Sequence, residues 1–197
     1  MNIKEVSFAV EGFGNVGLFA AKFMTEAGAK LVGASDSKGL VYDKDGIDFK
    51  KLEEAKKKGS VIDYGGEIKK SDEILDIEAD VLITAAIPDL IKEKDIERLK
   101  FKIIVEGSNI PMNEKIEEKL KNDILIVPDF VANAGGVISS YVEYEGLGEE
   151  KMFELVKEKV VNNTRLVLEK AKEKKISQRK AAMKIAKERV LGNKRLN

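Results

Sequence analysis

The sequence predicts an α/β fold in which a doubly wound, mainly parallel sheet carries helices on both faces. Apolar runs of strand length alternate with amphipathic helical patterns along residues 1–148. The runs at 81–86, 103–106 and 124–127 are almost continuously apolar, which is typical of strands buried on both faces. Strand–helix–strand repetition implies right-handed crossovers between parallel strands.

The first half of the chain supplies its elements in a regular order. An apolar strand at 6–10 leads through a glycine-rich turn into a helix that includes 18–24, and a second apolar strand follows at 30–35. Residues 43–77 are more polar and contain a lysine-rich helix at 48–58. We expect this polar segment to lie on the rim of the sheet.

The second half contains predicted helices at 91–100 and 113–122, and it ends in a helical pair over 149–197. This pair is predicted at 150–174 and 177–191. Apolar residues recur at helical spacing along its first member, and the simplest expectation is that this stripe packs against the sheet. The stripe consists of Phe153, Val156, Val160, Val167 and Leu168.

A glycine-rich turn at residues 12–17, Gly-Phe-Gly-Asn-Val-Gly, stands between the first strand and its helix. Gly12 allows a tight turn, Gly14 allows the backbone to approach a pyrophosphate, and Gly17 allows close packing of helix on strand. Free N–H groups at the helix start would bind the phosphates. Asp36 lies 19 residues after Gly17, near the ~20-residue spacing of an acid that binds the adenosine ribose. The pattern predicts a Rossmann-type dinucleotide site.

The composition excludes several kinds of chemistry. The 197 residues include no Cys and no His, so disulfides, thiol nucleophiles and the commonest general base are excluded. A cofactor must therefore carry any reaction, and we expect no metal site. Lys and Arg number 35, as do Asp and Glu, so no net charge attracts nucleic acid.

The hydrophobic content of 43% indicates one domain over residues 1–197 with a sizeable core. No apolar stretch approaches the ~20 residues of a membrane span, and the N-terminus has no signal-peptide pattern. A cytoplasmic protein without a membrane partner is therefore expected. Abundant Lys and Glu also fit a heat-adapted source.

Polar and small residues follow the predicted strands where ligands bind in doubly wound sheets, beyond the carboxyl ends. They occur at 85–88, 106–109 and 128–129, and a second glycine-rich turn follows at 133–136. Such residues would let a flat ring such as nicotinamide lie against the backbone. Each segment also fits an ordinary turn, with Asn133 as a helix N-cap. Together, at the same edge as the glycine turn, they favour a binding site.

These segments resemble the glutamate/leucine/phenylalanine/valine dehydrogenase family, specifically the NAD(P)-binding domain of glutamate dehydrogenase. The matches run in order through the chain: Gly12 to Gly17, Ser35 to Gly39 with Tyr42 and Gly46, Ala85-Ala86, Val105 to Asn109, Val127 to Asp129, Asn133 to Gly136, and Lys175 to Ala182. The insertion at 36–64 and the sequence 140–143 favour the glutamate branch. One departure is Ile110, where the family has glycine.

The resemblance implies oxidative deamination of L-glutamate to 2-oxoglutarate and ammonia, with reduction of NAD(P). It also implies a cofactor site. The pyrophosphate would lie against Gly12, Gly14, Asn15, Val16 and Gly17, the adenosine ribose would meet Asp36, and the nicotinamide half would meet Ala85, Ala86, Asn109 and Asn133. Phe13 and Ser37 belong to the same site. Ser140 would reach the side-chain carboxylate of the substrate.

Family members also carry a substrate domain with the motifs Gly-Gly-Gly-Lys-Gly-Gly and Pro-Ala-Pro-Asp, which do not occur in these 197 residues. We therefore expect no N-terminal substrate domain and no catalytic residue in the chain, and cofactor binding without turnover. A homo-oligomer or a complementary substrate domain is the expected partner. Part of the apolar face of the last helices is expected to be uncovered, because these helices cross to the substrate domain in the family.

Asp36 favours NAD over NADP, since a carboxylate hydrogen-bonds a 2′-hydroxyl and repels a 2′-phosphate. Lys38, two residues on, would offset that repulsion, so NADP stays open. Two other functions also stay open: the cofactor domain of a branched-chain amino-acid dehydrogenase, and a non-catalytic nucleotide-binding module.

Overall fold

The computed structural model describes residues 2–193 and has one seven-stranded sheet in the order β4-β3-β2-β1-β5-β6-β7. The strands β2, β1, β5, β6 and β7 are mutually parallel, whereas β3 and β4 are antiparallel at one edge. The strand bounds are β1 Ser7–Glu11, β2 Lys30–Asp36, β3 Gly39–Tyr42, β4 Glu67–Lys69, β5 Val81–Thr84, β6 Ile103–Glu106 and β7 Leu125–Val127. The predicted mainly parallel, Rossmann-type sheet is confirmed.

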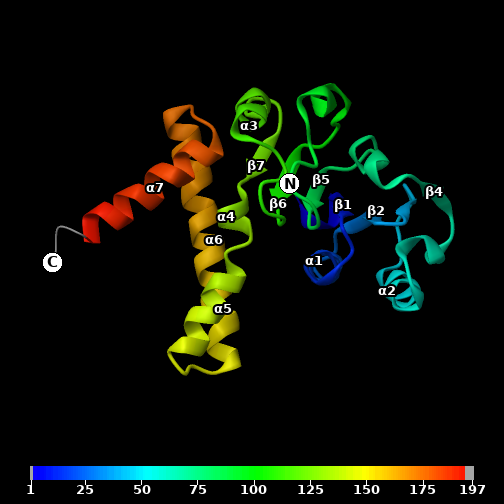
Figure 1. Ribbon diagram of the computed structural model, residues 1–197, viewed down its shortest axis with the longest axis horizontal. Coiled ribbons are helices and arrows are strands. Elements are labelled where there is room, and N and C mark those ends of the chain that lie inside the picture. The colour runs from blue at the N-terminus through cyan, green and yellow to red at the C-terminus, as the bar shows by residue number, and fades with distance from the viewer. Residues whose placement is uncertain (1, 194–197) are drawn as a thin grey trace.

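Helices cover both faces of the sheet, and a helical pair extends from its β7 side (Figure 1). The α-helices are α1 Asn15–Glu26, α2 Phe49–Lys58, α3 Glu114–Leu120, α4 Asp129–Ala132, α5 Gly135–Tyr144, α6 Glu149–Lys174 and α7 Gln178–Asn193. Short 3-10 helices are η1 Ile3–Glu5, η2 Val61–Tyr64, η3 Ser71–Leu75 and η4 Glu93–Arg98. Within residues 2–193, no helix is long and apolar enough to cross a membrane.

Alternate residues of the central strands pack into two separate cores. Ala9 of β1 packs with η3 and α3 on one face, whereas its neighbours Phe8 and Val10 pack with α1 and α2 on the other. All three side chains are fully buried. This two-sided burial explains why the strands are continuously apolar in the sequence.

The strand register brings four polar residues into one row at the carboxyl edge of the sheet. Glu11 of β1 pairs with Ser35 of β2 and with Thr84 of β5, which in turn pairs with Glu106 of β6. All four are buried. From β1 the chain continues to β2 on one side, and the later strands β5, β6 and β7 lie on the other side. This reversal of strand order is the topological switch point, and ligands bind such sheets at its carboxyl edge.

Two predicted helical segments differ in the structure. The segment 91–100 forms only the 3-10 helix η4, because the main-chain N–H of Ile91 donates to Pro111 and Asp89 adopts a left-handed φ of 51°. In α6, Val167 is buried, but Phe153 is 57% exposed. The expectation that Phe153 packs against the sheet is wrong, because the first half of α6 extends beyond the sheet beside α5 (Figure 1). The expected uncovered apolar face is therefore present.

Candidate dinucleotide-binding site

The glycine turn joins β1 to α1, and each glycine occupies a different environment. Gly12 has φ +86°, and an added Cβ would lie 2.4 Å from the Cβ of Ala86. A Cβ on Gly17 would lie 1.9 Å from the carbonyl oxygen of Gly12. A Cβ on Gly14 would meet nothing within 4 Å in the described chain. Gly12 and Gly17 are therefore required by packing, and only Gly14 faces open space.

That open space lies at the N-terminus of α1. Gly14 is the N-cap residue of this helix, and among the described residues no side chain caps it. The first N–H groups of a helix have no partner within the helix, and the helix dipole makes this end favourable for anions. The arrangement fits a phosphate group, for which the absent Cβ of Gly14 leaves room.

A cavity of about 390 Å³ opens beside the turn and extends to the end of β2. Its volume lies within the range of small-molecule sites. Six of the predicted cofactor residues line it: Gly12, Phe13, Gly14, Asp36, Ser37 and Ala86. The structure thus brings together residues of the glycine turn with the predicted ribose-binding acid.

Asp36 is surrounded by donors from its own chain. Its Oδ2 accepts from Nζ of Lys56 at 2.7 Å and from the main-chain N–H of Val61 at 3.1 Å. Its Oδ1 accepts from the main-chain N–H of Lys38 and the hydroxyl of Ser60, each at 2.9 Å. Burial alone would raise the pKa of Asp36, but Lys56 and the other donors outweigh it and lower the pKa to about 2. The carboxylate is therefore charged and neutralised by Lys56.

The cation beside Asp36 is Lys56, and the expectation that Lys38 supplies this charge is wrong. Lys38 supplies a main-chain N–H to Asp36, whereas the ammonium comes from Lys56 on α2. Lys56 also lines the cavity. Several lysines occur in the α2 segment, and no sequence pattern distinguishes Lys56 from the others.

Glu11 shapes the opposite wall of the cavity. Its Oε2 accepts from the main-chain N–H groups of Ala85 and Ala86 at 3.1 and 3.2 Å. Burial raises the pKa of Glu11, although these N–H groups act against the rise. Through these contacts Glu11 holds Ala86 against Gly12. No sequence pattern indicates this role.

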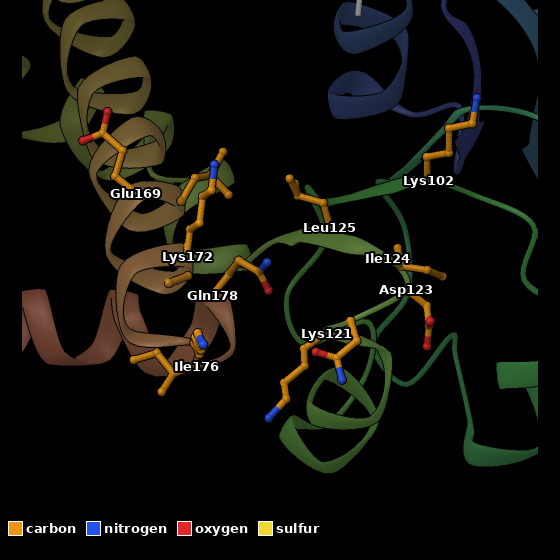
Figure 2. Close-up of a pocket in the computed structure, with 13 residues that line it drawn as sticks. Lys102, Lys121, Asp123, Ile124, Leu125, Glu169, Lys172, Ile176 and Gln178 are labelled. Atoms are coloured by element: carbon orange, nitrogen blue, oxygen red, sulfur yellow. The ribbon is translucent and has the colours of Figure 1, made fainter.

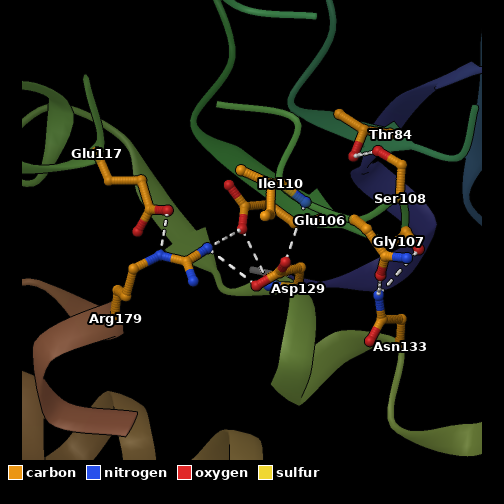
Figure 3. Close-up of polar contacts among 10 residues, drawn as sticks. Thr84, Glu106, Gly107, Ser108, Ile110, Glu117, Asp129, Asn133 and Arg179 are labelled. Carbon is orange, nitrogen blue, oxygen red and sulfur yellow. Dashed lines mark hydrogen bonds and ion pairs between the residues drawn. The ribbon is translucent and has the colours of Figure 1, made fainter. Parts of the chain in front are cut away.

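The two predicted asparagines of the nicotinamide side meet in the structure. Nδ2 of Asn133 donates to Oδ1 of Asn109 at 2.8 Å. It also reaches the carbonyl oxygen of Gly107 at 3.5 Å (Figure 3). Asn133 ends α4, and the N-cap of α5 is Ala134. The alternative that Asn133 caps the following helix is therefore wrong.

A buried ion cluster lies behind these asparagines (Figure 3). Nη2 of Arg179 donates to Oε2 of Glu106 and to Oδ1 of Asp129, both at 2.9 Å, and its Nε donates to Glu117. Burial and the neighbouring Glu117 raise the pKa of Glu106 to about 8. Three carboxyl groups share one guanidinium, so a proton on Glu106 reduces the excess negative charge.

Two further regions lie away from the cavity. Ser140 is exposed on α5, and its hydroxyl donates to the carbonyl oxygen of Gly136 at 3.2 Å. A hollow of about 700 Å³ lies near the starts of β6 and β7 and is bordered by α6 (Figure 2). Lys102 and Lys172 are on its rim. This hollow is at the sheet end opposite the glycine turn, so it is separate from the dinucleotide site.

Residues 1–196 match the family model described as Glutamate/Leucine/Phenylalanine/Valine dehydrogenase. The chain belongs to this family. It is 41% identical to glutamate dehydrogenase of Aeropyrum pernix over 81% of this chain and 40% of that protein. It is 40% identical to NADP-specific glutamate dehydrogenase of Saccharolobus shibatae, over 78% of this chain and 38% of that protein. It is 36% identical to a cryptic catabolic NAD-specific glutamate dehydrogenase of Bacillus subtilis, over 87% of this chain and 42% of that protein.

Solved structures of amino-acid dehydrogenases have the same fold. Hetero-hexameric glutamate dehydrogenase from Thermus thermophilus aligns with a TM-score of 0.82 at 23% identity, over 96% of this chain and 47% of that one. L-tryptophan dehydrogenase from Nostoc punctiforme aligns with a TM-score of 0.78 at 28% identity, over 98% and 54%. The chain thus spans about half the length of these solved structures. It spans less than half the length of the curated relatives.

Proposed function

We propose that this chain is the nicotinamide-dinucleotide-binding part of a glutamate dehydrogenase, which converts L-glutamate, NAD(P)⁺ and water to 2-oxoglutarate, ammonia and NAD(P)H. The observation that carries the proposal is the open space at Gly14, which faces the uncapped end of α1 beside a cavity that reaches Asp36. Family membership and glutamate dehydrogenase relatives at 36–41% identity support it.

In this proposal the residues of the chain bind and orient the cofactor, which supplies hydride transfer when bound. The N–H groups at the start of α1 hold the pyrophosphate beside Gly14. The Asp36 end of the cavity receives the adenosine ribose. Asn109 and Asn133, which are already in contact, orient the nicotinamide half.

In this proposal the chain contributes cofactor binding and no proton-transfer residue. The chain has no histidine, and its buried carboxyl groups at Glu11 and Glu106 are engaged by main-chain N–H groups or Arg179. A polypeptide of these residues alone should therefore bind cofactor without oxidising glutamate. In a complete enzyme, Ser140 on the exposed face of α5 would contact the substrate.

We propose NAD as the cofactor, with NADP accepted as well. Asp36 opposes a 2′-phosphate, but Lys56 lies 2.7 Å from its carboxylate and supplies a compensating charge at the same end of the cavity. Discrimination between the cofactors should therefore be modest. The relatives include one NADP-specific and one NAD-specific protein, which agrees with a family that uses either.

We also propose an oligomer or a covering domain at the α5 and α6 arm. Large apolar and aromatic side chains are exposed there: Val137, Tyr141, Tyr144, Leu147 and Phe153. Exposed apolar surface of this kind marks protein interfaces. The hetero-hexameric assembly of the Thermus thermophilus protein agrees with this proposal.

Calorimetric titration of the purified chain with NAD⁺ and NADP⁺ tests cofactor binding. Heat of binding for at least one of them is expected, and its absence for both would contradict the proposal. Substrate choice is tested on a complete enzyme that contains this region, with L-glutamate compared against L-leucine, L-valine and L-tryptophan. Preference for an apolar amino acid would instead favour the second candidate, another amino-acid dehydrogenase, which the Nostoc punctiforme match supports.

A further inference from the structure

Arg179 reaches from the C-terminal helices to the carboxyl edge of the sheet. It lies near the start of α7, yet its guanidinium contacts Glu106 at the end of β6, Glu117 on α3 and Asp129 at the start of α4. The side chain is only 16% exposed. Its guanidinium carbon also lies 5.4 Å from the centre of the Phe130 ring. This one side chain therefore links four elements: α7, β6, α3 and α4.

Two of these partners lie next to the asparagines of the nicotinamide side. Glu106 precedes Asn109 by three residues, and Asp129 precedes Asn133 by four. The carboxylate of Asp129 also accepts from the main-chain N–H of Ile110 at 3.0 Å, immediately after Asn109. The main-chain N–H of Asp129 in turn donates to Glu106 at 2.9 Å. Arg179 thus fixes both segments that carry the asparagine pair.

We propose that Arg179 is a positioning residue for the nicotinamide half of the cofactor, because it holds the segments that bring Asn109 and Asn133 together. This inference rests on the proposed function. Arg179 itself does not line the cavity beside the glycine turn, so its effect is confined to one half of the ligand.

The geometry requires arginine at this position. The planar guanidinium donates from Nε to Glu117 and from Nη2 to both Glu106 and Asp129. A lysine ammonium is a compact point charge and cannot reproduce donors fixed in a fork. Loss of the cation would leave buried carboxyl groups without their partner, which is strongly unfavourable. We therefore expect Arg179→Lys to retain the fold more readily than Arg179→Met, while misplacing the asparagine pair.

The test compares two ligands on the same protein. ADP carries the adenosine and pyrophosphate groups, whereas NAD⁺ adds the nicotinamide half. Calorimetric titration of wild type, Arg179→Lys and Arg179→Met should show NAD⁺ affinity lowered about tenfold or more, as loss of one well-placed hydrogen bond would produce. ADP affinity should stay within about twofold of wild type. A merely structural role would lower both affinities together.

Arg189→Met is the matched control, because Arg189 lies on the same helix and pairs with Asn163 instead. It should bind both ligands as wild type does. If Arg179→Met fails to fold, Arg179→Lys carries the test. Equal losses for ADP and NAD⁺, or no loss for either, would refute the positioning role while the proposed function stands. If wild type binds neither ligand, the proposed function fails and this inference fails with it.

Discussion

The main-chain N–H of Ile110 donates to Oδ2 of Asp129 at 3.0 Å, and Ile110 adopts a left-handed backbone with φ 48°. This conformation is unfavourable for a β-branched residue. The side chain of Ile110 is 55% exposed, so its burial offers little compensation. The contact with Asp129 instead holds the turn in place.

Ile110→Gly should therefore stabilise the protein. The left-handed conformation costs roughly 1–2 kcal/mol for a residue with a Cβ, and the extra freedom of glycine in the unfolded chain removes part of the gain. We expect the free energy of unfolding to rise by about 1 kcal/mol in urea denaturation. Ile87→Gly is the control, because Ile87 is similarly exposed without a positive φ, and it should lose stability. Equal effects of the two changes would contradict the argument.

Gly14→Val should abolish cofactor binding and leave the fold intact. Its side chain enters the open space where the pyrophosphate is proposed to lie, and a Cβ at this position meets no atom of the described chain within 4 Å. Calorimetric titration should give no heat of binding with NAD⁺, and thermal unfolding should stay near wild type. Gly17→Val is the contrasting variant, which should fail to fold because its Cβ would overlap Gly12. Unchanged NAD⁺ affinity in Gly14→Val would place the cofactor elsewhere.

Cofactor preference should depend on the pair formed by Asp36 and Lys56. Lys56→Ala removes a positive charge near the proposed 2′ position and should lower NADP⁺ affinity about tenfold relative to NAD⁺. Asp36→Ala should lower NAD⁺ affinity while NADP⁺ affinity rises or holds. Both dissociation constants are measured at one salt concentration, because salt screens the electrostatic interaction of the 2′-phosphate with the protein.

Lys57→Ala is the matched control for this pair. Lys57 neighbours Lys56 on α2 but pairs with Glu53 on the surface. It should leave the ratio of the two affinities unchanged. If neither Lys56→Ala nor Asp36→Ala moves the ratio, the 2′ position does not lie at this end of the cavity.

The stability of the protein should fall as pH rises from about 4.5 to 8. Burial and Glu117 raise the pKa of Glu106 from 4.5 to about 8, so the folded protein binds more protons than the unfolded chain in this window. Stability decreases with pH wherever the folded state is the better proton acceptor. Glu106→Gln stays neutral and should flatten the dependence of unfolding free energy on pH.

Glu93→Gln distinguishes this effect from a general change in charge. The Lys119 ammonium lowers the pKa of Glu93, so its contribution is lost only as pH falls below about 4.5. Between pH 5 and 8 its urea denaturation series should retain the wild-type slope. A wild-type slope in Glu106→Gln would show that Glu106 is ionised when folded.

The sequence predicted those parts of the fold that local patterns determine. The buried strands were recognisable because both faces are apolar, and the glycine turn because its residues are adjacent. The strand β3 was missed, although it forms a short hairpin with the adjacent strand β2. The 3-10 helix η4 was expected as a regular helix, because the Ile91–Pro111 contact depends on a distant segment. The sequence also predicted the candidate cofactor-binding residues along the glycine turn. It did not predict the side chains that hold the candidate site in place.

Those supports come from residues that only folding brings together. Lys56 and Ser60 reach Asp36 from 20 and 24 positions away, and Arg179 reaches Glu106 across 73. No spacing rule relates such positions. The pairing of Asn109 with Asn133 likewise depends on where α4 begins beside β6. Single-sequence reasoning therefore identified the candidate site and missed the network that holds it.

The unequal environments of the three glycines bear on how such a turn evolves. A Cβ would overlap neighbouring atoms at Gly12 and Gly17 but would meet open space at Gly14. Selection for a folded chain alone would thus preserve the first and third glycines and allow the middle one to drift. In a library randomised at all three positions, survivors chosen only for folding should be diverse at position 14. Selection for the proposed cofactor binding, rather than for folding, would therefore be needed to keep the middle glycine.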